Sequence, residues 1–208
     1  MERIYLDNAA TTRVRPEAVQ AALPIMTEIY GNPSSIHSFG REAKKALEKA
    51  RCQVAAAIGA KKEEIYFTAG GSESDNWALK GVAHTLSSKG KHIITTAIEH
   101  HAILHTCAAL EKEGFTVTYL PVDEYGRVTA EQVEKALTPE TILVSVMMAN
   151  NEIGTVEPIA EIGAVCKAHK VLFHTDAVQA VGHLPIDVKA MNIDLLSLSG
   201  HKFYAPKG

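Results

Sequence analysis

The sequence has no strong excess of one charge and no long apolar segment. Its 208 residues carry 21 basic against 24 acidic side chains, a formal net charge of −3. Such a balance lacks the broad positive field that non-specific nucleic-acid binding requires, so we expect no nucleic-acid partner. No stretch approaches the roughly 20 apolar residues that span a bilayer, and the N-terminus is charged where a signal peptide would become apolar. We therefore expect a cytoplasmic protein with no membrane partner.

Cysteine is scarce and shows no ligand spacing. Cys52, Cys107 and Cys166 are odd in number and far apart, and they match neither a CxxC pair nor a zinc site. His101 and His105 lie four residues apart on an expected helix, but no third ligand accompanies them. We expect reduced thiols and no metal. Cys52 and Cys166 lie among alanines and valines, which predicts that both are core residues.

From about residue 60 onward, β-rich segments alternate with helical ones. This pattern predicts an α/β fold with a mainly parallel sheet, and the nearly continuous apolar strands predict helices on both faces, giving three layers. A capping box at Thr129 and a proline at Pro158 mark two of the helix starts. The expected strands are residues 64–68, 92–96, 115–120, 141–147, 171–175 and 194–198.

The first 60 residues show no convincing strand. Two helices are expected there, at 16–30 with an interruption at Pro24 and at 38–58 with Gly59 ending it. We expect residues 1–60 to form an N-terminal helical arm and residues 61–208 to form an α/β domain. Because the chain stops at Gly208 without a terminal helix or polar tail, we expect this domain to be incomplete at its C-terminus.

A glycine turn, Gly70-Gly71-Ser72, separates the expected strand at 64–68 from a helix. Such a turn presents free backbone N–H groups and the positive end of the helix dipole, which suits a phosphate group. The Ser72 hydroxyl adds a donor. The segment matches neither GxGxxG nor GxxxxGK[ST], and an ordinary capped helix start is the alternative interpretation.

Asp176 follows an expected buried strand, with Gln179 three residues later. Open α/β sheets bind ligands at the carboxyl ends of their strands. An aspartate there can pair with the protonated ring nitrogen of pyridoxal phosphate (PLP), which makes that cofactor an effective electron sink. The alternative is an aspartate that only caps a helix.

Lys202 follows the expected strand at 194–198, close to Ser199 and His201. A lysine there can form a Schiff base with an aldehyde cofactor, while Ser199 and His201 donate to its phosphate. A lone lysine after a strand is usually a solvated surface residue. The combination is more informative, because three strand ends together supply a phosphate cradle, an acid for a ring nitrogen and an amine for an aldehyde.

Two loops add polar groups at the same edge of the expected sheet. His100 follows the strand at 92–96, where an imidazole can stack on a ring and move protons. Asn150 and Asn151 follow the strand at 141–147 and offer amides to a ring oxygen or a substrate carboxylate. Paired histidines in a loop and an asparagine-rich turn also occur without any function.

With these residues, the chain resembles cysteine desulfurases of the NifS/IscS type, fold-type I PLP enzymes of the class V aminotransferase group. The resemblance runs along the whole sequence and implies the large PLP-binding domain of that fold, ending before the small domain. The motifs that carry it are Leu6-Asp-Asn-Ala-Ala-Thr-Thr12, Gly31-Asn-Pro-Ser-Ser-Ile-His37, Thr68-Ala-Gly-Gly-Ser-Glu-Ser-Asp-Asn76, Glu99-His100, Asn150-Asn-Glu-Ile-Gly154, His174-Thr-Asp-Ala-Val-Gln179 and Ser199-Gly-His-Lys202.

The resemblance implies a role for each candidate residue. Lys202 matches the Schiff-base lysine, Asp176 the acid at the pyridine nitrogen, and His100 the histidine that stacks on the ring and transfers protons. Gln179 matches the amide near the ring hydroxyl, and Asn151 the amide at the cofactor and substrate. The phosphate-binding set is matched by Gly71, Ser72, Ser199 and His201. Gly71-Ser72 departs from the common Ala-Thr, but serine keeps the hydroxyl.

The implied reaction takes sulfur from L-cysteine, leaving L-alanine and an enzyme persulfide for iron–sulfur cluster or related sulfur biosynthesis. The implied partners are a second subunit in a homodimer and a sulfur-acceptor or iron–sulfur scaffold protein. The nucleophilic cysteine and the small domain of such enzymes lie beyond Gly208, so we expect this chain alone to be inactive. The alternatives are a selenocysteine lyase, another class V member, or a truncated, non-catalytic PLP-binding remnant.

Overall fold

The computed structural model describes residues 3–207, and a parallel β-sheet forms its centre. Within these residues the sheet has five strands in the order β2-β1-β3-β4-β5. Every neighbouring pair is parallel, so the carboxyl ends of the strands lie along one edge. The strands are β1 (His92–Thr96), β2 (Thr116–Leu120), β3 (Thr141–Ser145), β4 (Leu172–Asp176) and β5 (Leu195–Ser197).

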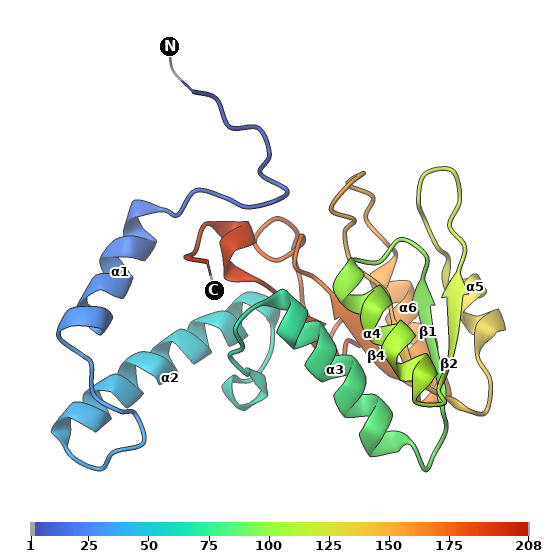
Figure 1. The fold of residues 1–208 in the computed structure, drawn as a ribbon, viewed down its shortest axis with the longest axis horizontal. Helices are drawn as coiled ribbons and strands as arrows, with labels where there is room; N and C mark the ends of the chain where they lie inside the picture. Colours follow the sequence, from blue (N-terminus) through green and yellow to red (C-terminus); the bar gives the residue numbers. More distant parts are fainter. Residues whose placement is uncertain (1–2, 208) are drawn as a thin grey trace.

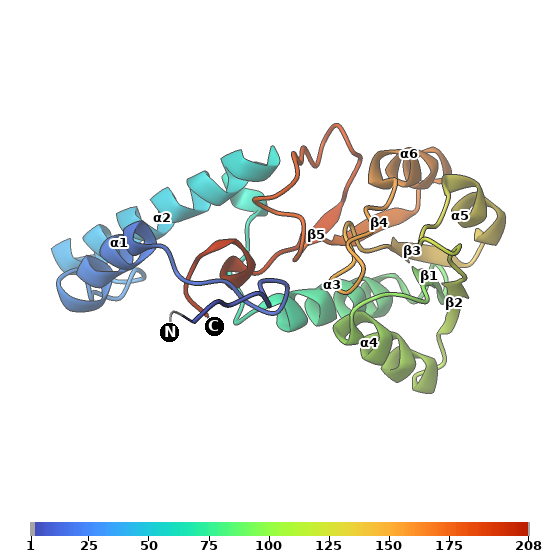
Figure 2. The ribbon, with the colours of Figure 1, turned by 90° about the horizontal axis from the view of Figure 1, so that it is seen from above.

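Helices cover both faces of the sheet, as Figure 2 shows. The helices α3 (Gly71–Leu86) and α4 (His101–Lys112) lie on one face, and α5 (Ala130–Ala136) and α6 (Ile159–His169) lie on the other. The expected three-layer α/β fold is confirmed.

Alternating side chains of the strands produce the two cores of these layers. In β1, Ile93 packs with Leu79 and Ile103 on the face of α3 and α4. The next residue, Ile94, packs with Ile162 and Phe173 on the other face. Each fully buried side chain of this size contributes about 1.5–3 kcal/mol to folding. Because both faces are covered, apolar side chains point to both sides of the inner strands, and the sequence shows this as nearly continuous apolar runs in several of them.

The two N-terminal helices extend away from the sheet (Figure 1). No residue of α1 (Pro16–Thr27) is buried, and Met26 is 76% exposed. The longer α2 (Ser38–Ile58) reaches the core near its C-terminal end, through Ala55 and Ile58, and Gly59 ends it in the left-handed conformation with φ 71°. The division at residue 60 stays a prediction, since the last turns of α2 already belong to the core.

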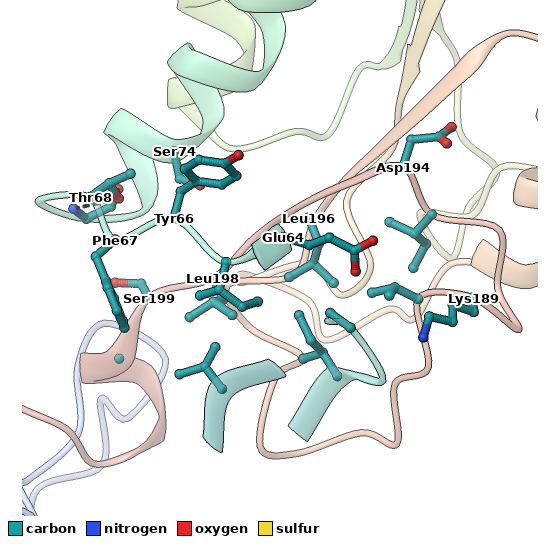
Figure 3. A pocket seen from close by; sticks show the side chains of 18 of the residues that line it. Glu64, Tyr66, Phe67, Thr68, Ser74, Lys189, Asp194, Leu196, Leu198 and Ser199 are labelled. Atoms are coloured by element: carbon teal, nitrogen blue, oxygen red, sulfur yellow. Dashed lines mark hydrogen bonds between the residues drawn. The ribbon is translucent and has the colours of Figure 1, made fainter. Parts of the chain in front are cut away.

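The prediction of a strand at residues 64–68 is wrong. A short 3-10 helix, η1 (Lys62–Glu64), begins this segment, and no residue of it pairs with a strand among residues 3–207. A cleft of about 1020 Å³ lies next to it, lined by Ile65 and Phe67 on this segment and by Leu196 on β5 (Figure 3). A strand requires a hydrogen-bonded neighbour, and across this cleft the segment has none.

The other five expected strands are confirmed, the strand at 92–96 with the same ends and the others with ends that differ by no more than two residues. The expected capping box also forms, because Thr129 Oγ1 accepts the Gln132 N–H at 3.1 Å and Gln132 Oε1 accepts the Thr129 N–H at 2.8 Å. Within residues 3–207, every helix is too short or too polar to cross a membrane.

Candidate functional site

A cleft of about 440 Å³ opens at the carboxyl edge of the sheet. It is bounded by the end of β4, the first turn of α3, the loop before α4 and the 3-10 helix η2 (Gly200–Phe203). Residues 7–10 of the N-terminal segment complete its wall. All nine residues predicted from the sequence line this single cleft: Gly71, Ser72, His100, Asn151, Asp176, Gln179, Ser199, His201 and Lys202.

The first turn of α3 forms one end of the cleft. Ser74 is the first residue of this helix whose N–H reaches a helical acceptor, Gly70 O at 3.1 Å, so the preceding amides are free to bind a ligand. A Cβ atom on Gly71 would lie 2.9 Å from Val178 Cγ2, which is closer than side-chain packing tolerates. Glycine therefore lets this turn approach the loop after β4, and Ser199, which follows β5, also lines the cleft.

Asp176 ends β4 and is almost completely buried, at 5% exposure. Its Oδ1 accepts the Val178 N–H at 2.9 Å. Burial raises the pKa of Asp176, while this hydrogen bond and the charges of His100 and Lys202 act in the opposite direction. The result is a carboxyl group that water barely reaches and that faces the cleft, and such a group suits a bound N–H⁺ group.

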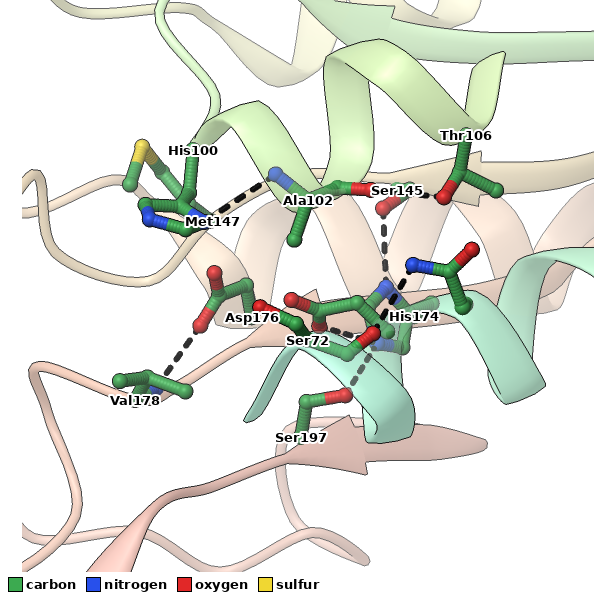
Figure 4. A network of polar contacts seen from close by, with 12 residues as sticks. Ser72, His100, Ala102, Thr106, Ser145, Met147, His174, Asp176, Val178 and Ser197 are labelled. Carbon is green, nitrogen blue, oxygen red and sulfur yellow. Dashed lines mark hydrogen bonds and ion pairs between the residues drawn. The ribbon is translucent and has the colours of Figure 1, made fainter. Parts of the chain in front are cut away.

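His100 and Lys202 both line the cleft, His100 directly before α4 and Lys202 within η2. His100 precedes α4 and caps it, since its Nδ1 accepts the Ala102 N–H at 3.1 Å (Figure 4). Lys202 lies in η2, and its Nζ donates to the carbonyl oxygens of Ala9 and Ala10. Burial lowers the pKa of Lys202, against the charges of Asp176 and Asp7. A lowered pKa favours the neutral amine, which is the nucleophilic form.

The N-terminal segment is held against η2 by a set of long-range hydrogen bonds. Thr12 donates both its N–H and its hydroxyl to His201 O, at 3.1 and 2.7 Å. His201 Nδ1 lies 3.0 Å from Thr11 Oγ1, and Gln179 Nε2 donates to Ala9 O at 2.9 Å. These contacts fix the positions of His201 and Gln179 relative to the cleft, so residues 9–12 act as a brace for its wall.

Two adjacent asparagines after β3 play different parts. Asn150 is buried and ties the loop together, because its Nδ2 donates to Ile98 O and its Oδ1 accepts the N–H groups of Glu152 and Ile153. Asn151 lines the cleft, and its Nδ2 donates to Glu152 Oε1 at 2.7 Å. Of the two, only Asn151 is placed to reach a ligand.

Glu99 joins the ends of β1 and β3 beneath this cleft. Its Oε1 accepts the Thr96 hydroxyl at 2.7 Å and the Met147 N–H at 2.9 Å, while its Oε2 has no partner among the described residues. Complete burial raises the pKa of Glu99 to about 8. Glu99 is therefore protonated at neutral pH, and its role is to hold the ends of β1 and β3 together.

Sequence reasoning gave no role to several residues that line the cleft, including Asp7, Ala9, Asp75 and Met147. Asp75 had a usable signal: it lies three residues after Ser72 in the same motif, so a helix places both on one face. The brace at Ala9 had no signal, because its contacts are made by backbone carbonyl oxygens whose position depends on the whole fold.

The three cysteines lie away from the cleft. Cys107 and Cys166 are fully buried, and burial raises the pKa of each thiol to about 12. Cys52, predicted to be a core residue, is exposed instead. The alanines and valines around it do not bury it, because α2 projects from the sheet and packs into the core only near its end.

The residues around the cleft fit PLP. The free amides at the start of α3, with hydroxyl groups from Ser72 and Ser199, suit its phosphate, and Asp176 suits its ring nitrogen. Lys202 provides an amine for its aldehyde. Among residues 3–207, no group of three or more histidine, cysteine or acidic side chains is arranged to hold a metal ion.

Residues 4–208 match the profile of the family described as aminotransferase class V. The chain is 62% identical over 205 residues to the cysteine desulfurase IscS of Methanosarcina thermophila, covering 99% of this chain and 51% of that protein. It is 54% identical to the mitochondrial cysteine desulfurase of Drosophila melanogaster, covering 99% of this chain and 45% of that protein.

Solved structures show the same partial coverage. A NifS-like protein, 44% identical, superposes with a TM-score of 0.96, covering 100% of this chain and 57% of that one. A structure of SspA in complex with cysteine, 46% identical, also has a TM-score of 0.96, with 99% and 59% covered. The chain thus spans about half the length of the relatives that it matches.

Proposed function

The chain belongs to the class V aminotransferase family, and from this premise we propose that it forms the PLP-binding part of a cysteine desulfurase. One observation supports the proposal above the others. A buried carboxyl group, an amine of lowered pKa and the free amides of a helix N-terminus converge on one cleft, although they come from three separate parts of the chain. These are the groups that PLP requires.

When bound, PLP supplies an electron sink for the charge that develops on the α-carbon of an amino acid. Asp176 holds a proton on the ring nitrogen, since a carboxylate buried from water is a strong partner for an N–H⁺ group. Lys202 would hold the cofactor through its aldehyde carbon, and its amine is the base that would take the proton from the substrate's α-carbon. His100 covers the open side of the cleft and is a second group that can move protons.

The phosphate end is held by groups that carry little positive charge of their own. The amides of Gly71 and Ser72 and the dipole of α3 attract the phosphate, and the hydroxyl groups of Ser72 and Ser199 donate to it. His201 completes the set, and Gln179 and Asn151 donate amide N–H groups to the ring hydroxyl and the substrate. These roles rest on the lining of the cleft.

L-cysteine is the proposed substrate, and the solved structure of SspA with cysteine favours it over other amino acids. Accepting its sulfur requires a thiolate beside the cofactor. None of the three cysteines lines the cleft, and two are buried with a pKa of about 12. The described residues therefore supply the cofactor chemistry, and we propose that the persulfide forms on a thiol outside this chain.

The proposed partners are a second copy of the chain, which would make a homodimer, and a sulfur-acceptor or iron–sulfur scaffold protein that takes the sulfur onward. Exposed apolar side chains support the first of these. Ile4, Leu6 and Met26 are 82%, 86% and 76% exposed, although an isolated domain gains nothing by presenting such groups to water. Met26 lies in α1, which has no buried residue of its own, and Ile4 and Leu6 lie in the N-terminal segment before it.

Borohydride trapping tests the cofactor site directly. The chain is mixed with PLP, reduced with borohydride and digested, and the modified lysine is located by mass spectrometry. We expect the label on Lys202, and none in Lys202→Ala. Lys207→Ala, which removes an exposed lysine five residues away, should leave the labelling unchanged. Labelling spread over surface lysines, or kept in Lys202→Ala, would overturn the proposed site.

A further inference from the structure

Asp75 is a buried acid at the cleft that the proposed function leaves unused. It lies in the first turns of α3, is 1% exposed and lines the cleft beside Asp176. Its Oδ1 has no hydrogen-bond partner among the described residues. A buried carboxyl oxygen without a partner is costly, so this group calls for an explanation.

His174 is the nearest titratable side chain, but it does not neutralise Asp75. Its Nε2 lies 3.7 Å from Asp75 Oδ1, which is beyond hydrogen-bond distance. Both ring nitrogens have other partners, because Nδ1 lies 2.9 Å from Ser145 Oγ and Nε2 lies 3.1 Å from Ser197 Oγ (Figure 4). Complete burial lowers the pKa of His174 to about 3, so the imidazole is neutral.

No fixed cation therefore balances a charge on Asp75. Burial, followed by the negative charge of Asp176, raises the pKa of Asp75 to about 8, with the Ser197 hydroxyl acting in the opposite direction. Two buried carboxyl groups that interact in this way hold one proton between them at neutral pH. Of the two, Asp176 is better placed to carry the charge, because the Val178 N–H and the charges of His100 and Lys202 oppose the rise in its pKa that burial causes.

We propose that Asp75 is a positioning residue of the cofactor site, a second carboxyl group behind Asp176 that releases its proton when a cationic ring nitrogen binds. The inference rests on the proposed function of Asp176. A bound N–H⁺ group would supply the positive charge that Asp75 lacks, and the two carboxylates together would hold that ring proton more firmly than one. Asp75 acts through Asp176 and takes no part in the reaction itself.

Few other titratable groups near Asp75 could account for a proton released on binding. The elements that pack on α3 are α4, β3, β4 and β5. From β3 and β5 come the hydroxyl groups of Ser145 and Ser197, which do not titrate in this range. Besides this pair, the titratable groups that line the cleft are Asp7, His100, Glu152, His201 and Lys202. His174 on β4 and Glu99 before α4 are buried close to it, and both interact with members of the pair.

The free chain allows a test that needs no cofactor. With carbon-13 in the aspartate carboxyl groups, NMR should show one aspartate that titrates near pH 8, as its raised pKa requires. The signal should vanish in Asp75→Asn and persist in Glu73→Gln, which removes an exposed charge from the same turn of α3. If no aspartate titrates near pH 8, the inference is wrong, whatever the chain does with PLP.

The second test measures protons released on binding. Calorimetry of PLP binding in buffers of different ionisation enthalpy should show about one proton more released by the wild-type chain than by Asp75→Asn at neutral pH. As the pH is raised toward 8, the wild-type affinity for PLP should also rise relative to that of the variant, by up to about tenfold per pH unit. Equal proton release in both chains would overturn the inference while leaving the proposed function intact, whereas no PLP binding by either would count against the proposed function.

Discussion

Ser145 Oγ lies 2.9 Å from His174 Nδ1, on a buried face of the sheet. This side-chain contact joins β3 to β4 in addition to their backbone hydrogen bonds. The other ring nitrogen of His174 reaches Ser197 Oγ on β5 at 3.1 Å. One buried imidazole thus links three strands. Because Asp176 follows two residues later in the same strand, it points to the same face as His174, toward α3 and the cleft.

Asp176→Asn should weaken PLP binding by more than about tenfold, since an amide cannot hold the ring proton as a carboxylate does. Fluorescence titration with PLP measures the affinity. Asp123→Asn is the matched control, because this exposed aspartate stabilises a turn away from the cleft and asparagine keeps the acceptor for the Tyr125 and Arg127 N–H groups. Equal affinity in Asp176→Asn and the control would contradict the assignment of Asp176.

Glu99→Gln should make the chain more stable at alkaline pH. The folded-state pKa of Glu99 is about 8, against about 4.5 for an exposed glutamate. Between these values the unfolded chain has lost the proton that the folded chain keeps, so rising pH lowers the free energy of unfolding, by on the order of 3 kcal/mol over the window. Glutamine mimics the protonated acid and keeps an acceptor for the Met147 N–H.

Urea unfolding between about pH 5 and about pH 8 measures this difference. His174 has the opposite effect at the acidic end, because its lowered pKa makes stability fall as pH drops below about 6.5. That term is common to the wild type and the variant and cancels in the comparison. The prediction is wrong if the two chains show parallel pH profiles.

Only one thiol should react rapidly in the folded chain. Cys107 and Cys166 are buried with a pKa of about 12, whereas Cys52 is exposed on α2. A thiol reagent should modify one cysteine quickly and all three after denaturation. In Cys52→Ser the rapid phase should disappear. A rapid phase that survives in this variant would show that the core around α4 or α6 opens readily.

The chain should form no stable persulfide when incubated with L-cysteine and PLP, and alanine should not exceed the amount produced by PLP alone. The physical reason is that no cysteine lines the cleft and that two of the three withhold the thiolate. Mass spectrometry of the protein, with alanine quantified alongside, measures both products. A persulfide on any of the three cysteines, formed with an equal amount of alanine, would refute this prediction.

Sequence reasoning succeeded where a local pattern determines the structure. The sequence pattern predicted β1 to β5, and parallel pairing then brought the residues after the strands to one edge, which is why seven of the nine candidate residues share a cleft; Gly71 and Ser72 reach it at the start of α3. It failed where the outcome depends on distant parts of the fold. Residues 64–68 have strand composition but face a cleft rather than a neighbour, and Cys52 has apolar neighbours in sequence but lies on a projecting helix. The interaction between the carboxyl groups of Asp75 and Asp176 could not be predicted either, because the two residues are about a hundred positions apart in the sequence.

Hydrogen bonds join residues 9–15 to residues 201–204, so the wall of the cleft is built from two segments that lie about 190 residues apart in the sequence. During synthesis the N-terminal segment emerges from the ribosome long before Lys202 and Tyr204, so it has nothing to bind until they appear. The sheet can pair strand by strand as it emerges, but the cleft cannot close in the same way. The wall of the cleft is completed only after β1 to β5 have emerged, so the cofactor site forms later than the sheet on which it rests.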